Sequence, residues 1–547
     1  MKRILSRVLP LLMIFAAACQ KEEIPSEEEK ALCSECTLKS ITLSISGNTV
    51  KFSQLGTKFS GVCLDWIKGD NPDVLTPNFT VSSGAKVYFN DTEVLSGKTS
   101  YSFAKDINCK VVAEDGKTSK NYTISLVCPQ INGELPVLHI YTSADKITSR
   151  HTYIETSLTM YSPFTDKGGW TVNDGKILIR GRGNSTWSMP KKPYRLKFPE
   201  DISPIGLNHC SAKSWVILAH DFDKSLIRNH LAFEVSRIVF DESEHFYGEG
   251  ALTFTPCSQM VNVYMNYKFH GVYQMSDQMQ RHKGRIAVEK LEKADGADPE
   301  KITGGHILES DIHASEAAPV AFHSRVSNIR FNHKYPDDED YDQAQFTYME
   351  DFLAEAEEVL YSDNFKDKEN GWRKYFDEKT MADYIVVKEF VGDMDGYTST
   401  YCYKRRGIDK IFFGPVWDCD KGWRNDKRVP YASYPPSSSL MIFAGFSMPY
   451  RNRSDWFQRV WEDEDFRKLV GERWQLKKSR LVACVKENLD TLPDAMAKSV
   501  EANFNVWDFS TQNMGDAPAP ASNYASEINR IESYTLARVK VLDNLLK

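Results

Sequence analysis

The sequence predicts two folded parts, a small all-β domain followed by a large α+β domain. Three observations support this fold class. Residues 38–130 alternate apolar and polar side chains between Gly, Asn and Asp turns. From residue 135 onward, short strand patterns give way to longer amphipathic helices. The chain has 547 residues, which is enough for more than one hydrophobic core.

The N-terminus carries the pattern of a targeting signal. Two basic residues precede the run ILSRVLPLLMIFAAA, which is too short to span a bilayer as a mature helix. Small residues stand before Cys19, as in the lipidation site of bacterial lipoproteins, and an ordinary secretory signal cleaved near Ala18 is the alternative. We therefore expect a lipoprotein signal peptide over residues 1–18, a lipid anchor at Cys19 and an acidic tether over residues 19–37.

Charge and hydropathy narrow the cellular location and the classes of partner that the sequence allows. The tether begins QKEE, and a lysine followed by acids resembles the surface-export signal of some Gram-negative lipoproteins. We therefore expect an outer-membrane or cell-surface location, with a periplasm-facing anchor as the alternative. No later segment is long and apolar enough to be transmembrane. The net charge of −7 is mild and argues against nucleic acid as a partner.

Residues 38–130 are predicted to form an immunoglobulin-like β-sandwich. LKSITLSISG and KVYFND have the alternation of strands, and EDGKTSKNYTISL has the pattern of a hairpin whose last strand closes the sandwich. We expect this module to act as a spacer or a binding module. Just before it, Cys33 and Cys36 form a CxxC, for which a local disulfide or free thiols are better explanations than a metal site.

Residues 135–547 are predicted to form the α+β domain. PVLHIYT, KILIRG and PYRLKF are expected to be strands, and MVNVYMNYKFHGVYQMSDQ a strand pair that leads into a helix. DFDKSLIRNHLAFEVSRIVF is expected to be a helix that Asp223 caps. TYMEDFLAEAEEVLY, KTMADYIVVKEFVGD and ASEINRIESYTLARVKVLDNLL also show helical spacing, and STYCYKR and KIFFGPVWD are strands around a turn.

A basic, glycine-containing stretch lies near the start of this domain. In residues 177–198, ILIRGRGNSTWSMPKKPYRLKF, Gly181 and Gly183 indicate a backbone that another group approaches closely. Four cations follow: Lys191, Lys192, Arg195 and Lys197. The stretch matches neither GxGxxG nor the Walker pattern, so a phosphate-binding turn and a purely structural turn are both open.

Two pairs of acids stand out in the C-terminal half. Asp393 and Asp395 follow a predicted helix, and Asp418 and Asp420 end a predicted strand. The segment between the pairs has the pattern of a hairpin, which would bring the pairs together. Clustered carboxylates favour a cation such as Mg²⁺ or Mn²⁺, although exposed loop acids or a structural Ca²⁺ site would also fit.

That arrangement suits phosphoryl transfer. Asp395 would orient or deprotonate a hydroxyl, Asp418 would hold the metal, and Lys197 would neutralise developing charge. The protein-kinase signatures HRD, DFG and VAIK are absent from the sequence.

Longer motifs contain most of the basic stretch and the two acid pairs. IRGRGNSTWSMPKKPYRLKF combines Gly-x-Gly-Asn-Ser, Trp, paired Lys and Tyr-Arg-Leu-Lys-Phe. LIRNHLAFEVSRI, FHGVYQMSDQMQR, GGHILESD, DMDGYTSTYCYKR, GPVWDCDKGW and WFQRVWEDEDFRKLVGERW follow in order. Over residues 135–547 the chain therefore resembles the CotH (spore coat protein H) kinase family of atypical secreted kinases. This resemblance implies a divergent protein-kinase-like fold that uses ATP and Mg²⁺ or Mn²⁺.

The resemblance also implies roles for the acids. Asp395 falls on the family's catalytic acid, and Asp418 falls on its metal-binding acid, accompanied by Asp420. Asp277 stands where the family commonly has Glu, a side chain one methylene longer that would pair with lysine. Glu309 falls on a further recurrent acid.

Basic and glycine positions follow from the same resemblance. Lys197 falls on the strand lysine that faces the nucleotide, and Arg182 and Lys192 are secondary candidates. The turn at Gly181 and Gly183 would lie over the phosphates.

We therefore expect an atypical secreted kinase that transfers phosphate from ATP to Ser or Thr of surface or exported proteins. Because a surface lipoprotein meets little ATP, the alternative is a non-catalytic, pseudokinase-like adhesin or binding module. The retained acids argue against that alternative, since loss of catalysis usually shows first as loss of a metal ligand. Glycan chemistry is a third hypothesis, compatible with 12% aromatic residues, but no carboxylate pair is placed for a glycosidase.

Overall fold

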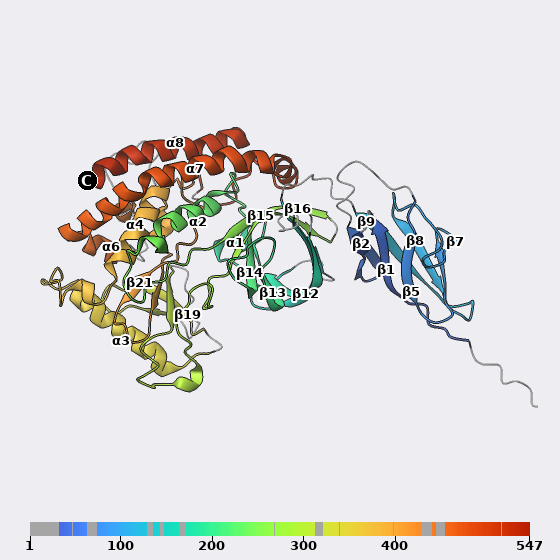
Figure 1. The fold of residues 1–547 in the computed structure, drawn as a ribbon, viewed down its shortest axis with the longest axis horizontal. Coiled ribbons are helices and arrows are strands. Elements are labelled where there is room, and N and C mark those ends of the chain that lie inside the picture. The colour runs from blue at the N-terminus through green and yellow to red at the C-terminus, as the bar shows by residue number, and fades with distance from the viewer. Residues whose placement is uncertain are drawn as a thin grey trace, which may run out of the picture. The chain divides into compact units, whose positions relative to one another are not determined.

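The computed structural model describes residues 32–45, 48–62, 74–127, 135–142, 147–162, 171–266, 268–311, 321–337, 340–397, 399–427, 440–444, 455–515 and 517–547 (Figure 1). The predicted signal peptide, Cys19 and most of the acidic tether lie outside these residues. The chain divides into two compact units, one within Met1–Phe52 and Pro72–Ser125, the other within Ser53–Asn71 and Leu126–Lys547. No helix in the described ranges is long and apolar enough to cross a membrane.

The N-terminal residues are all β, as the alternation predicted. One three-stranded sheet has the order β2 (Asn48–Lys51), β1 (Leu38–Ile45), β5 (Pro77–Val81). A six-stranded sheet has the order β3 (Ser53–Leu55), β4 (Lys58–Val62), β9 (Ser119–Val127), β8 (Ile107–Val112), β6 (Lys86–Phe89), β7 (Thr92–Glu93). The predicted hairpin is confirmed, because β8 and β9 are antiparallel with Val112 opposite Ser119. The immunoglobulin-like topology stays a prediction.

A closed barrel begins the α+β part. Its strands are β10 (Val137–Tyr141), β11 (Ile154–Ser162), β12 (Thr171–Gly181), β13 (Tyr194–Ile202), β14 (Ala212–Leu218), β16 (Lys268–Asp277) and β15 (Ser258–Met265), in that order around the barrel. Alternation along β13 places Tyr194 and Leu196 in the apolar cluster of the barrel. The intervening cations, Arg195 and Lys197, therefore lie on the other face of the strand.

A second sheet and the helices complete this part. The five-stranded sheet has the order β18 (Ala321–His323), β19 (Arg330–Tyr335), β17 (His306–Ser310), β20 (Tyr401–Lys404), β21 (Ile411–Phe413). The helices are α1 (Ser185–Ser188), α2 (Arg228–Val239), α3 (Gln343–Leu360), α4 (Glu378–Val391), α5 (Met441–Ala444), α6 (Asp455–Val460), α7 (Glu464–Val506) and α8 (Tyr524–Leu545). In Figure 1, α7 runs beside α8 and packs on α2 and α4.

Most predicted helices are confirmed, and two details differ. The helix at α2 begins at Arg228 rather than near Asp223, because Asp223 Oδ1 accepts the Ser225 N–H and orders a turn before the helix. No helix follows β16: the chain turns there, with a bridge between Arg281 and Ile286. The architecture is mixed α+β, as predicted, and the divergent kinase-like fold stays a prediction.

Candidate active site

One cleft of about 1040 Å³ is lined by residues from both the basic stretch and the two acid pairs. Gly183, at the end of the basic turn, is one of its lining residues. Asp395, Asp418 and Asp420 line the same cleft. The cleft is bounded by side chains from residue 150 to residue 515, so chain segments far apart in sequence build it.

The two glycines of the turn have different roles. Gly183 has φ +87°, and a Cβ there would lie 2.1 Å from Thr186 Oγ1, so the turn needs glycine. A Cβ on Gly181 would lie 2.2 Å from the Trp187 ring, and Gly181 does not line the cleft. Gly181 therefore makes room for the tryptophan, whereas Gly183 faces the cleft.

Four arginines line the cleft: Arg150, Arg180, Arg182 and Arg195; Lys191, Lys334 and Lys421 line it as well. Arg150 Nη1 donates to the Gly183 carbonyl at 2.8 Å and fixes the turn. The Arg182 guanidinium lies 5.8 Å from the centre of the Trp417 ring, next to the acids. Cations and carboxylates therefore line the same cleft.

The two lysines predicted as nucleotide-binding, Lys192 and Lys197, lie outside the cleft. Lys197 is exposed, does not line the cleft and stands 5.9 Å from the Tyr153 ring centre. It shares a strand face with Arg195 but is one pleat further from the turn, so Arg195 takes the cleft position that the resemblance implied for Lys197. Lys192 Nζ donates to the carbonyls of Trp187 at 2.7 Å and Met189 at 3.0 Å, which ties the turn together away from the cleft.

The acidic residues meet as the hairpin predicted. β20 and β21 pair with Cys402 opposite Phe413, and this returns the chain to the end of α4. Asp395 lies in the short 3-10 helix Met394–Tyr397, and its Oδ2 is 2.8 Å from Lys421 Nζ. Asp418 has φ +59°, in the left-handed region, which turns its side chain into the cleft.

Asp393 lies behind the cleft wall rather than in it. It is fully buried, and its Oδ2 is 3.1 Å from Lys388 Nζ. Lys388 Nζ also lies 3.1 Å from the Trp417 carbonyl and 3.1 Å from Cys419 Sγ. Asn229 Oδ1 accepts the Cys419 N–H at 2.6 Å. These contacts hold the turn that carries Asp418 from both sides.

A buried arginine supports the same turn from α2. Arg228 Nε donates to the Gly422 carbonyl at 3.0 Å, and its Nη2 is 2.7 Å from Glu527 Oε1 in α8. Its Nη1 forms an ion pair with Asp223. Arg228 therefore joins three segments around the acidic turn.

Crowding changes the acidity of the carboxylates. Asp418 is exposed at the cleft surface, but desolvation by the atoms packed around it raises its pKa; Glu309 and Asp395 raise it further, while Arg182 and Lys388 oppose them, and the net direction is upward. Burial and the Asp418 charge raise the pKa of Asp420 well above its usual range, against Lys421. Among the described residues, no ion pair reaches Asp418 or Asp420. A cation between these two carboxylates would relieve this repulsion.

Two further acids stand on β17 and just after it. Glu309 Oε2 pairs with Lys334 at 2.9 Å, and Asp311 Oδ2 accepts from Asn184 at 3.2 Å and Asn332 at 3.3 Å. Both line the cleft. Sequence reasoning missed Asp311, although residues two apart in an extended segment share a face and GGHILESD carries that signal. Arg150 and Asn229 also line the cleft, but no pattern in the sequence marks them as site residues.

Asp277 departs from its predicted place. It is fully buried and does not line the cleft. Its Oδ1 pairs with Arg285 Nε at 2.6 Å, and its Oδ2 is 2.8 Å from His209 Nε2. The predicted lysine partner is therefore replaced by an arginine and a histidine at the end of β16.

The residues present fit a nucleotide with a divalent ion. Two carboxylates without an ion-pair partner in the described part of the chain, Asp418 and Asp420, offer oxygen ligands, which Mg²⁺ and Mn²⁺ prefer. The arginines that line the same cleft match the charge and geometry of phosphate oxygens.

A comparison with protein families and a comparison with solved structures each found a match. The family model described as CotH kinase protein matches residues 179–542. No curated protein matches. A crystal structure from Bacteroides thetaiotaomicron, described as a proposed glycoside hydrolase, matches with 18% identity and a TM-score of 0.16. That match covers 31% of this chain and 53% of the other, so this chain spans about half of that structure's length.

Proposed function

The chain belongs to the CotH kinase protein family, and from that premise we propose that it transfers the terminal phosphate of ATP to Ser or Thr of exported or surface proteins. The observation that carries the proposal is the polarised cleft. Carboxylates that lack an ion-pair partner among the described residues, Asp418 and Asp420, line one space, large enough for a nucleotide, together with four arginines.

Each group of lining residues has a role in this proposal. Asp418 and Asp420 would hold Mg²⁺ or Mn²⁺, and the bound ion would neutralise charge on the phosphates. Arg182 and Arg195 would bind phosphate oxygens, with the Gly183 turn beside them. Asp395 would accept the proton of the acceptor hydroxyl, and Lys421 holds its carboxylate in place.

Binding and transfer can be tested separately. Thermal shift with ATP and Mg²⁺ or Mn²⁺ should show a metal-dependent rise in Tm of the full chain. Asp418→Ala should lose that rise. Asp395→Asn should keep it but should abolish incorporation of labelled phosphate. Asp490→Asn, at an exposed position of α7 paired with Lys486, is the matched control and should behave like wild type.

The outcomes separate a kinase from a binding protein. Metal-dependent binding without transfer to any protein, with Asp395→Asn equal to wild type, would indicate a non-catalytic nucleotide-binding protein. Absence of any shift with either metal would refute the proposal and leave the surface-binding alternative.

A further inference from the structure

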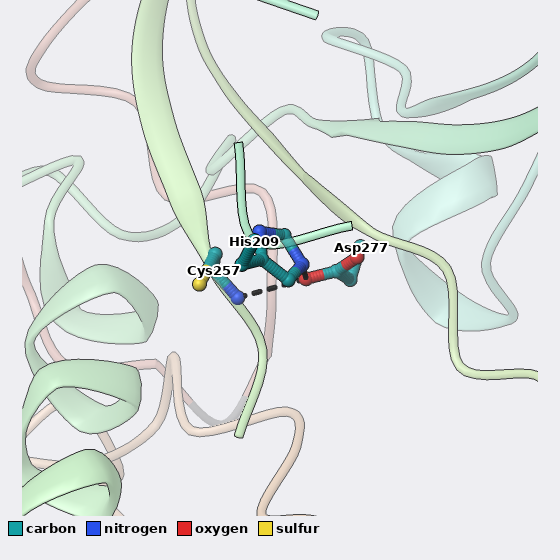
Figure 2. Close-up of side chains that lie close together, drawn as sticks. All are labelled: His209, Cys257 and Asp277. Carbon is teal, nitrogen blue, oxygen red and sulfur yellow. Dashed lines mark hydrogen bonds and ion pairs between the residues drawn. The ribbon is translucent and has the colours of Figure 1, made fainter. Parts of the chain in front are cut away.

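A second cluster of ionisable side chains lies at one end of the barrel. His209 and Cys210 precede β14, Cys257 precedes β15, and Asp277 ends β16. The donor atoms of His209, Cys257 and Asp277 all lie within 4.8 Å of one another (Figure 2). None of these residues lines the cleft. The cluster therefore needs an explanation separate from the proposed kinase chemistry.

Strand pairing brings the cluster together. Ser258 pairs with Ser276, so Cys257 and Asp277 lie side by side at the ends of adjacent strands. The Cys257 N–H donates to Asp277 Oδ2 at 2.9 Å, which Figure 2 shows as a dashed line. Asp277 also pairs with Trp215, in the strand that follows His209. Three barrel strands therefore fix the positions of the donors.

The groups converge on a single ring nitrogen. Asp277 Oδ2 lies 2.8 Å from His209 Nε2, and Cys210 Sγ lies 3.4 Å from the same atom. Cys257 Sγ lies within 4.8 Å of a His209 ring nitrogen. In a nucleophile–histidine–acid relay, the acid and the nucleophile occupy opposite ring nitrogens. The carboxylate and the Cys210 thiol share Nε2, so the arrangement is not such a relay.

We propose that His209, Cys257 and Asp277 form a Zn²⁺ site and that the Cys210 thiol, which lies outside this group of three, turns in as the fourth ligand. Thiolate, imidazole and carboxylate are the ligands that zinc takes in proteins, usually four in a tetrahedron. The ion would occupy the place of the proton that His209 Nε2 shares with these neighbours. Binding would release that proton and the two thiol protons to solvent, because each ligand binds in its deprotonated form.

The surroundings complete the charge balance. Two thiolates, one carboxylate and Zn²⁺ sum to one negative charge, which Arg285 at Asp277 Oδ1 neutralises. Arg285 Nη1 also donates to the Ser214 carbonyl at 2.8 Å, so its position does not depend on the metal. Arg237 Nη1 lies 3.2 Å from Cys257 Sγ, and Glu234 balances its charge at 3.2 Å.

Access and rigidity favour a structural ion. The His209 side chain is 23% exposed, whereas the Asp277 side chain is fully buried, so the cluster reaches the surface at His209. Cys210 packs against Gly284, where a Cβ would lie 2.4 Å from Cys210 Cβ. With four protein ligands no position remains for a substrate, and such closed zinc sites are structural.

Cobalt substitution tests the site directly. Co²⁺ added under reducing, anaerobic conditions to the purified, metal-free full chain should give a thiolate-to-cobalt charge-transfer band and intense tetrahedral bands in the visible spectrum. One equivalent of Zn²⁺ should abolish both. Oxygen-only coordination in the cleft cannot produce the thiolate band, so Asp418→Ala should leave it unchanged. The result is therefore independent of the proposed kinase function.

Variants assign the ligands. Cys257→Ser and His209→Gln should lose the charge-transfer band or weaken cobalt affinity at least about 100-fold, and Cys484→Ser, a partly exposed cysteine of α7, should match wild type. His209 is at the surface, so His209→Gln should fold even if Cys257→Ser does not. A wild-type chain without the thiolate band, variants that keep it, or a Cys210–Cys257 disulfide in the purified chain would each overturn the proposal.

Discussion

Lys421 Nζ lies 2.8 Å from Asp395 Oδ2, and both side chains line the same cleft. Lys421 follows the acidic turn directly, whereas Asp395 follows α4. The ion pair therefore links the two acid-bearing segments. It sets the orientation of the carboxylate proposed to accept a proton.

Replacing Lys421 should reduce transfer more than binding. We expect Lys421→Met to lower the rate of phosphate transfer about 10-fold to 100-fold, because the Asp395 carboxylate loses its fixed orientation. The metal-dependent thermal shift with ATP should persist. Lys421→Arg should restore part of the rate. Equal rates in wild type and Lys421→Met would exclude a positioning role.

Arg182 and Lys197 offer a matched test of which basic residue binds the nucleotide. Arg182→Ala should raise the Kd for ATP with metal about 10-fold or more, because a charge-assisted bond to phosphate contributes about 1.5–3 kcal/mol. Lys197→Ala, at an exposed position outside the cleft, should bind like wild type. Isothermal titration measures both, and the reverse ranking would favour the position implied by the family resemblance.

A side chain at position 183 should destabilise the turn. Gly183→Ala places an L-residue at φ +87° and should lower the free energy of unfolding by about 1–2 kcal/mol, besides weakening nucleotide binding. Gly175→Ala, on the preceding strand β12, is the control, because a Cβ there meets nothing within 4 Å. Denaturant unfolding compares the two variants. A Gly183→Ala protein as stable as Gly175→Ala would contradict the strained-turn explanation.

Arg228 should be a major stability determinant. Arg228→Met leaves Asp223 and Glu527 buried without their cation and should cost about 3–5 kcal/mol. Arg480→Met removes a half-exposed arginine paired with Asp241 and Glu244, and should cost about 0–1 kcal/mol. Chemical denaturation of both variants checks the difference, and equal costs would mean that the buried network contributes little.

The same network predicts a pH dependence. Burial opposes ionisation of Asp223, but Arg228, His220 and Ser225 outweigh it and hold the pKa of Asp223 below its usual range. The unfolded chain then binds more protons, so this contribution is present above about pH 4 and is lost as the pH falls through the folded value. In Arg228→Met the contribution is missing. The difference in stability between wild type and variant should therefore narrow as the pH falls below about 4, measured by thermal unfolding; a constant difference in this range would contradict the assignment.

Local patterns predicted the fold class and the meeting of the acids. The hairpin between Asp395 and Asp418 follows from alternation and turn residues, both of which act over short distances. The 43-residue helix α7 was not predicted, because it contains Pro493 and is stabilised by packing on α2, α4 and α8. Its existence depends on contacts that local patterns do not encode.

The basic side was predicted in outline and misassigned in detail. Alternation places Arg195 and Lys197 on one strand face, but only three-dimensional curvature decides which one reaches the cleft. The partners of Asp277 were also beyond local reasoning, because Arg285 and His209 arrive from turns outside its own strand. Long-range pairing of charges therefore limited what the sequence alone could predict.

The contacts of Arg228 connect the acidic turn of the cleft to helix α8. Helix α8 contributes no lining residue, yet its Glu527 shares Arg228 with the Gly422 carbonyl beside the acidic turn. A partner that bound α8 and a ligand that entered the cleft would both act on this one turn. A change at Glu527 would therefore reach the acidic turn through Arg228, although Glu527 and Arg228 are far apart in the sequence.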